Sequence, residues 1–237
     1  MRPTRIPGLL ALICLLAAPC AVPPVGGAEH AWQRALDRQV RDFLEQNSRS
    51  WRDANVPEVD GQKLHDLIVE NGYTRALEVG TSTGHSGIWI AWALSKTGGK
   101  LTTIEIDEGR YREAVANFEE AGLSPYIDAR LADAHALVPE LEGPFDFVFV
   151  DADKDWYTQY FRWLLPKLET GGCFTAHNVG DINSSSQQRR RRSGGMAPDF
   201  VRELLATPAL ATEFFSSGGG LSVSFKESAT AGQPRRR

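Results

Sequence analysis

The chain has 237 residues, of which 42% are hydrophobic and 24% are charged, and its formal net charge is −4 at pH 7. This length suits one α/β domain with appendages, and the acidic balance argues against a nucleic-acid partner bound mainly through phosphate contacts. Two arginine clusters, at 189–192 and 235–237, stand among Ser, Gly, Gln and Pro. That context favours a solvated loop and a disordered basic tail (229–237) over a binding patch.

The first 28 residues have the composition of a targeting segment. Arg2 and Arg5 precede an apolar run at 8–18, and small residues follow up to Ala28. This order predicts a secretory signal peptide cleaved after Ala28, because the apolar run is too short to span a bilayer comfortably. The protein is therefore expected to be secreted or periplasmic. The alternative is an uncleaved N-terminal membrane anchor, and only this segment is expected to contact a membrane.

The segment 29–228 is expected to form one domain in which helices and strands alternate. Two helices come first, at 29–52 and from Asp60, a candidate N-cap, to 71. Apolar residues at helical spacing predict the buried face of the first helix: Trp32, Leu36, Val40, Phe43 and Leu44. Five strands then alternate with four helices, with strands at 75–79, 100–106, 126–131, 145–150 and 173–176, and helices at 86–95, 108–120, 134–141 and 156–168.

The end of the chain changes this rhythm. A helix at 199–205 is followed by two short strands, at 213–215 and 221–225, which flank a turn of Ser and Gly. These strands predict a hairpin at one edge of the sheet. The whole pattern predicts an α/β fold with a doubly wound, mostly parallel sheet and helices on both faces.

The loop after the first strand contains Gly80 and Gly84 and leads into a helix. Glycines let a backbone approach a ligand closely, and a helix N-terminus offers free N–H groups. The same pattern also occurs in turns that serve only packing. Its spacing, Glu-x-Gly-x-x-x-Gly, differs from the dinucleotide fingerprint and disfavours an NAD-dependent enzyme.

Polar side chains end every predicted parallel strand. They are Glu78, Glu105, Asp133, Asp151 and the pair His177 and Asn178. Because ligands of open α/β sheets bind outside the carboxyl ends of the strands, this pattern predicts a binding site. Glu105 is placed to accept two ribose hydroxyls, since Asp107 can cap the following helix. Asp133 suits an adenine contact and a helix N-cap equally well.

Four motifs resemble one known family: Leu77–Ser86 (LEVGTSTGHS), Thr103–Asp107 (TIEID), Ala132–Ala134 (ADA) and Asp146–Tyr157 (DFVFVDADKDWY). They are similar to the class I S-adenosylmethionine-dependent O-methyltransferases of the catechol and caffeoyl-CoA type. The resemblance covers residues 60–225. It implies a Rossmann-like, seven-stranded sheet with an antiparallel last strand, and S-adenosylmethionine lying over the first loop.

The resemblance also implies roles for individual residues in binding the cofactor. Glu78, Gly80 and Ser86 would hold the methionine end, Glu105 the ribose, and Asp133 with Ala134 the adenine. Thr81 and Asp151 complete the expected cofactor-binding set.

The chemistry implied by the family uses a metal and a base. Asp151 would bind a divalent cation, usually Mg²⁺, which binds two adjacent acceptor hydroxyls and lowers the pKa of one. Lys154 would be the general base, so that the resulting phenolate attacks the sulfonium methyl group in line. Asn178 and His177 would complete the metal site.

His177 departs from the family pattern, because metal-dependent members usually carry Asp-Asn where this chain has His177-Asn178. Imidazole is a softer ligand that suits Mn²⁺, Fe²⁺ or Zn²⁺ better than Mg²⁺. The hypothesis is that metal dependence is weakened or changed. His177 would then serve as a second acid/base or a substrate contact.

The sequence as a whole predicts an O-methyltransferase that acts on a small phenolic or catechol-like acceptor, as a homodimer. The loop at 184–195 is expected to cover the acceptor. The alternative is a non-catalytic S-adenosylmethionine-binding module in the cell envelope. The signal peptide supports that alternative, since the methyl donor is made in the cytosol.

Overall fold

The computed structural model describes residues 25–49, 51, 55–179 and 197–228. Over these residues, seven strands form one sheet in the order β3-β2-β1-β4-β5-β7-β6. The strands β1 to β5 pair in parallel, and β7 is antiparallel to both of its neighbours. The predicted sheet with an antiparallel last strand is therefore confirmed. The strands are β1 (Arg75–Val79), β2 (Lys100–Glu105), β3 (Ile127–Leu131), β4 (Phe145–Val150), β5 (Leu168–His177), β6 (Leu210–Phe215) and β7 (Leu221–Lys226).

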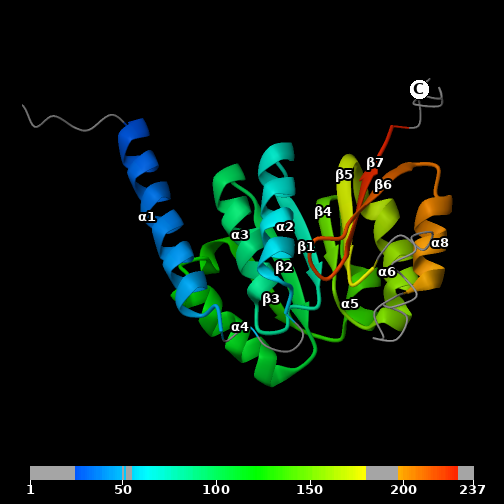
Figure 1. Cartoon of the computed structure of the whole chain (residues 1–237), viewed down its shortest axis with the longest axis horizontal. Coiled ribbons are helices and arrows are strands. Elements are labelled where there is room, and N and C mark those ends of the chain that lie inside the picture. The colour runs from blue at the N-terminus through cyan, green and yellow to red at the C-terminus, as the bar shows by residue number, and fades with distance from the viewer. Residues whose placement is uncertain (1–24, 50, 52–54, 180–196, 229–237) are drawn as a thin grey trace, which may run out of the picture.

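Helices cover both faces of the sheet (Figure 1). One layer contains α1, α2, α3 and α4, and α4 contributes Phe118 to its core. The other layer contains α5, α6 and α8. The helices are α1 (Val25–Gln46), α2 (Glu58–Asn71), α3 (His85–Thr97), α4 (Glu108–Glu120), α5 (Ala134–Glu140), α6 (Tyr157–Leu164) and α8 (Pro198–Ala206). Short 3₁₀ turns lie at Ser124–Tyr126, Lys154–Trp156 and Leu165–Lys167.

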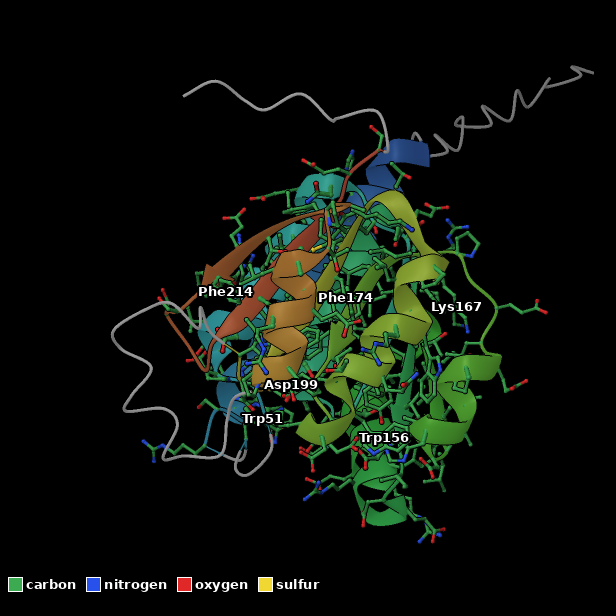
Figure 2. All side chains as sticks on the ribbon, turned by 90° about the vertical axis from the view of Figure 1, so that its right-hand side faces the viewer. Trp51, Trp156, Lys167, Phe174, Asp199 and Phe214 are labelled. Atoms are coloured by element: carbon green, nitrogen blue, oxygen red, sulfur yellow. The ribbon has the colours of Figure 1, made fainter. Side chains whose placement is uncertain are left out.

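The central strands are buried on both faces and supply two separate cores. In β4, Phe147 and Phe149 face the α1 to α4 layer, whereas Val148 and Val150 face α5, α6 and α8. This alternation is the period of two that a strand imposes on its side chains. Phe174 of β5 lies in the second core (Figure 2). It packs edge-on against Phe161, with ring centroids 5.3 Å apart.

The strand order reverses next to β1, which lies between β2 and β4. The chain runs outward from β1 to β2 and β3, and then returns to build β4, β5 and the hairpin on the other side. Such a switch point leaves a crevice at the carboxyl ends of the strands. The polar residues that end these strands are thereby brought to one edge.

Several predicted boundaries are corrected by the structure. The first helix spans Val25–Gln46. Trp32, predicted on its buried face, is 50% exposed, and its ring centroid lies 6.3 Å from that of Tyr126. The helix α6 ends at Leu164 because the next turn contains Pro166, which lacks the N–H of a regular helix. The strand β5 begins earlier than predicted, at Leu168, and a bulge separates its first pair from the rest.

The predicted targeting segment lies almost wholly outside the described residues, although α1 runs across the expected cleavage point at Ala28. The loop at 184–195 and both arginine clusters also lie outside them. Among the helices that are described, none is long and apolar enough to cross a membrane.

Candidate active site

A cavity of about 450 Å³ opens at the carboxyl ends of β1, β2, β3 and β4. Five residues of the predicted cofactor-binding set line it: Gly80, Glu105, Asp133, Ala134 and Asp151. They come from the carboxyl ends of four different strands and the loops that follow them. The structure therefore brings together residues that the sequence places up to 71 positions apart.

Glu105 is held rigidly at the cavity wall and is only 6% exposed. Its Oε2 accepts a hydrogen bond from the Ser82 N–H at 2.7 Å, and its Oε1 accepts from the N–H groups of Ile106 and Asp107 at 3.1 and 2.9 Å. Asp107 itself caps α4 by accepting from the Arg110 N–H. The helix-capping role is thus filled by Asp107, and Glu105 forms part of the cavity lining.

The predicted N-cap role of Asp133 is confirmed, and its contact with an adenine stays a prediction. It is the N-cap of α5, because its Oδ1 accepts from the His135 N–H at 2.9 Å, and it also lines the cavity with Ala134. A carboxylate that caps a helix keeps further lone pairs for a ligand.

Glu78, Thr81 and Ser86 are buried and do not line the cavity. Glu78 is fully buried, with its Oε2 accepting from the Thr103 hydroxyl and its Oε1 without a hydrogen-bond partner. Burial raises the pKa of Glu78 to about 7, against the lowering effect of the neighbouring Ser86 and Thr103 hydroxyls. An unpaired buried carboxylate oxygen is the kind of group that a cationic ligand would satisfy.

Ser82 lines the cavity, although the sequence did not single it out as a cofactor-binding residue. Its φ is +50°, and its hydroxyl is buried without a hydrogen-bond partner in the structure. The only signal was its place between Gly80 and Gly84. Gly80 is required here, because its φ is +99° and a Cβ would overlap the backbone oxygen of Asp151.

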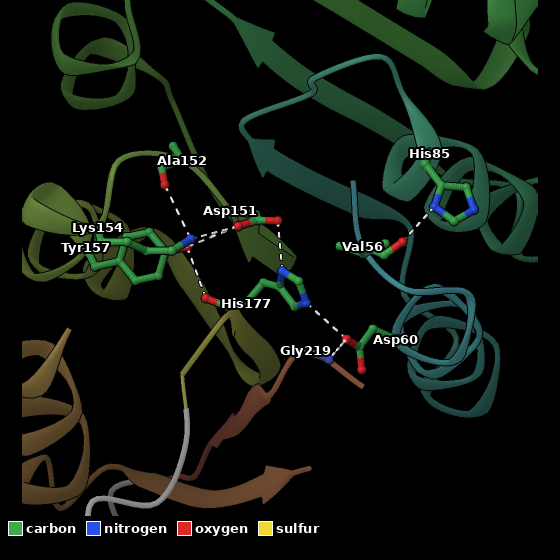
Figure 3. A network of polar contacts seen from close by, with 9 residues as sticks. All are labelled: Val56, Asp60, His85, Asp151, Ala152, Lys154, Tyr157, His177 and Gly219. Atoms are coloured by element: carbon green, nitrogen blue, oxygen red, sulfur yellow. Dashed lines mark hydrogen bonds and ion pairs between the residues drawn. The ribbon is translucent and has the colours of Figure 1, made fainter. Parts of the chain in front are cut away.

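A second cluster of polar side chains adjoins the cavity through Asp151 (Figure 3). Lys154 Nζ donates to Asp151 Oδ1 at 2.8 Å and to the Tyr157 hydroxyl at 2.6 Å. The Nδ1 of His177 bonds to Asp151 Oδ2 at 2.9 Å. The predicted catalytic residues Lys154 and His177 therefore share one carboxylate, which also forms part of the cavity wall.

Asp60 is the fourth charged member of this cluster, and its predicted role as an N-cap is wrong. The helix α2 begins earlier, with Pro57 at the cap position, so Asp60 lies inside the first turn on the same buried face as Leu64. It is fully buried, and its Oδ2 bonds to His177 Nε2 at 3.0 Å and accepts from the Gly219 N–H at 2.6 Å. The sequence signal was a carboxylate at helical spacing with apolar core residues.

His177 is 3% exposed and lies between two carboxylates. Burial alone would lower the pKa of its imidazole, but the hydrogen bonds and negative charges of Asp151 and Asp60 raise this pKa to about 9. Burial would raise the pKa of Asp151, yet His177 and Lys154 hold it below its usual value. At neutral pH the cluster therefore contains an imidazolium with both ring nitrogens donating.

The predicted metal site, Asp151 with His177 and Asn178, does not fit a divalent cation in this arrangement. A metal-binding histidine needs a free ring nitrogen, and both nitrogens of His177 are bonded to carboxylates. Both oxygens of Asp151 accept from cationic groups. Across the described ranges, no group of three His, Cys, Asp or Glu side chains is arranged to hold a metal ion.

The pKa of His177 predicts how stability depends on pH. A histidine whose pKa is raised by folding stabilises the fold below its ordinary value of 6.5, and this contribution is lost as the pH rises through about 9. The difference between these values corresponds to about 3 kcal/mol. We expect the free energy of unfolding of the unmodified protein to fall by about this amount relative to His177→Gln over that range. Urea titrations that show the same pH dependence for both proteins would contradict an imidazolium at this position.

Comparisons with known proteins agree with this geometry. The model of a family described as O-methyltransferase matches residues 29–224. A catechol O-methyltransferase from Niastella koreensis is 42% identical over 107 residues, which cover 44% of this chain and 48% of that protein. Caffeoyl-CoA O-methyltransferase 1 from Zea mays is 35% identical over 126 residues, which cover 51% and 48% of the two chains. The chain spans about half the length of these curated relatives.

The fold is likewise similar to that of solved O-methyltransferases. The structure of an O-methyltransferase from Bacillus cereus in complex with SAH has a TM-score of 0.64 and 25% identity, and the match covers 85% of this chain and 97% of that one. The family match extends over nearly all of the helices and strands described above. The chain belongs to the O-methyltransferase family.

Proposed function

We propose that this protein transfers the methyl group of S-adenosylmethionine to a hydroxyl of a small phenolic, catechol-like acceptor. The observation that carries the proposal is the position of Asp151, which lines the cofactor-sized cavity and also binds Lys154. A candidate base thus stands next to the wall of a candidate cofactor site. Family membership and relatives named as catechol and caffeoyl-CoA O-methyltransferases support the same reaction.

The residues of the cavity fit the parts of S-adenosylmethionine. Glu105 would accept the two ribose hydroxyls, and Asp133 with Ala134 would contact the adenine. The unpartnered hydroxyl of Ser82 suits the carboxylate of the methionine end. Glu78 is buried and does not line the cavity, so its contact with the ammonium is proposed from the family resemblance and from its unpartnered oxygen. The complex of the Bacillus cereus relative with SAH supports a cofactor of this class.

Lys154 would act on the acceptor. In its neutral form its Nζ takes the proton of the acceptor hydroxyl, and the resulting phenolate oxygen forms a bond to the methyl carbon while the bond from carbon to sulfur breaks. The sulfonium becomes a neutral thioether, and the new ammonium remains beside Asp151. Holding the two reactants in line would supply much of the rate. A non-catalytic module is not favoured, because it would have no need of this pair.

Replacing Glu105 with alanine is expected to weaken S-adenosylmethionine binding by about 100-fold or more. The change removes a carboxylate that would accept two hydroxyls, and hydrogen bonds to charged groups contribute about 1.5–3 kcal/mol each. Calorimetry with the unmodified protein and the variant measures the effect. The control is Glu108→Ala, which removes an exposed acid paired with Arg112 on the next helix.

Two outcomes of this experiment would count against the proposal. Absence of S-adenosylmethionine binding to the unmodified protein would remove the cofactor, and equal binding by Glu105→Ala would remove the site. A screen of catechols and related phenols for methylated products then tests the reaction itself.

From the sequence alone, we further propose that the protein is exported through residues 1–28 and that it forms a homodimer.

A further inference from the structure

We infer that the ion-paired cluster of Asp60, His177 and Asp151 takes the place of a divalent cation, so that methyl transfer by this chain requires no metal. The inference rests on the proposed function and specifies its chemistry. It concerns a cluster whose third member, Asp60, comes from a helix that precedes the whole sheet.

The imidazole ring of His177 contacts two carboxylates. His177 Nδ1 and Nε2 lie 2.9 and 3.0 Å from carboxylate oxygens of Asp151 and Asp60, so the ring bridges two acids as a bound cation would. The backbone also fits this ring. A Cβ at Gly219 would overlap His177 Nε2, and a Cβ at Gly218 would overlap the carboxylate of Asp60. The turn before β7 therefore leaves room for the ring and its partner acid.

The negative and positive charges in the cluster balance each other. Two carboxylates, Asp60 and Asp151, face one imidazolium and the ammonium of Lys154, so the cluster is balanced without any added ion. A dication bound to Asp151 would lie close to the Lys154 ammonium, which is 2.8 Å from the same carboxylate. In a site of low dielectric such repulsion is strong. A cation between these acids would have to displace the imidazole of His177 from both of them, although Asp60 Oδ1 itself has no hydrogen-bond partner.

The direct experiment measures Mn²⁺ binding to the full chain by electron paramagnetic resonance and methyl transfer after treatment with EDTA. We expect no stoichiometric Mn²⁺ binding by the unmodified protein and a change in activity of less than about twofold in EDTA. His177→Asp removes the imidazolium and places a third carboxylate beside Asp60 and Asp151. This variant is expected to bind one Mn²⁺, because hard cations prefer oxygen ligands. The control His30→Asp changes an exposed histidine and should bind none.

The inference is overturned if the unmodified protein binds one Mn²⁺ that Asp151→Asn abolishes. It is also overturned if EDTA lowers activity by about tenfold or more and added metal restores it. A protein that transfers no methyl group under any condition contradicts the proposed function, whereas the Mn²⁺ measurement still decides on the cluster. If His177→Asp does not fold, the ¹⁵N spectrum of the unmodified protein provides the test. Both nitrogens of His177 should carry protons at pH 7 with and without Mg²⁺, and loss of either proton on adding Mg²⁺ would contradict the inference.

Discussion

Replacing Lys154 with methionine is expected to lower kcat by about 10²–10⁴-fold and to leave the affinity for S-adenosylmethionine unchanged. This range is the usual contribution of a positioned general base. Lys154 lies outside the cavity lining and contacts it through Asp151 and the backbone oxygen of Ala152. Steady-state kinetics with a phenolic acceptor and calorimetry with the cofactor separate the two effects.

Two further variants sharpen this result. Lys154→Arg keeps a positive charge beside Asp151 but cannot accept a proton at neutral pH, so it should be nearly as inactive as Lys154→Met. Recovery of activity in Lys154→Arg would show that the charge alone is needed and would contradict a role as base. Lys100→Met, at an exposed position that begins β2, should retain full activity.

Replacing Asp60 with alanine is expected to destabilise the fold by about 3–5 kcal/mol, because it leaves the buried imidazolium of His177 with one missing partner. Both groups of this pair are almost completely buried, so water cannot replace the lost contact. The same change removes the acceptor of the Gly219 N–H. Urea unfolding of the variant at pH 7 measures the loss.

The matched control lies on the same helix. Asp66 is 44% exposed at its side chain and bonds to His65, so Asp66→Ala should cost less than about 1 kcal/mol. Asp60→Asn retains an acceptor for His177 without the charge and should fall between the two. Similar free energies of unfolding for Asp60→Ala and Asp66→Ala would show that the buried ion pair has no special role.

The sequence predicts those features of the fold and of the site that depend on a local pattern of residues. The apolar run at Phe145–Val150 and the acid that follows it predicted both the strand and the position of Asp151. Because parallel strands end at one edge, Glu105 and Asp133 could be placed in the same site without the structure. The structure confirms that these three residues line one cavity.

The parts that the sequence does not predict depend on contacts between distant segments. Asp60 precedes His177 by 117 residues, and nothing in the local pattern of α2 indicates that the two meet. Without Asp60, His177 resembles a metal ligand that follows a strand. With it, both ring nitrogens are occupied and the imidazole is a cation. Whether a residue is a ligand or an ion-pair partner thus follows from its tertiary neighbours, and a motif position alone leaves the question open.

The most direct test of the central claim is methyl transfer from labelled S-adenosylmethionine to a catechol by the full chain, in buffer with excess EDTA. We expect a methylated phenolic oxygen and one molecule of SAH for each methyl group transferred. Binding of S-adenosylmethionine without transfer to any catechol or related phenol, with or without metal, would contradict the proposed reaction.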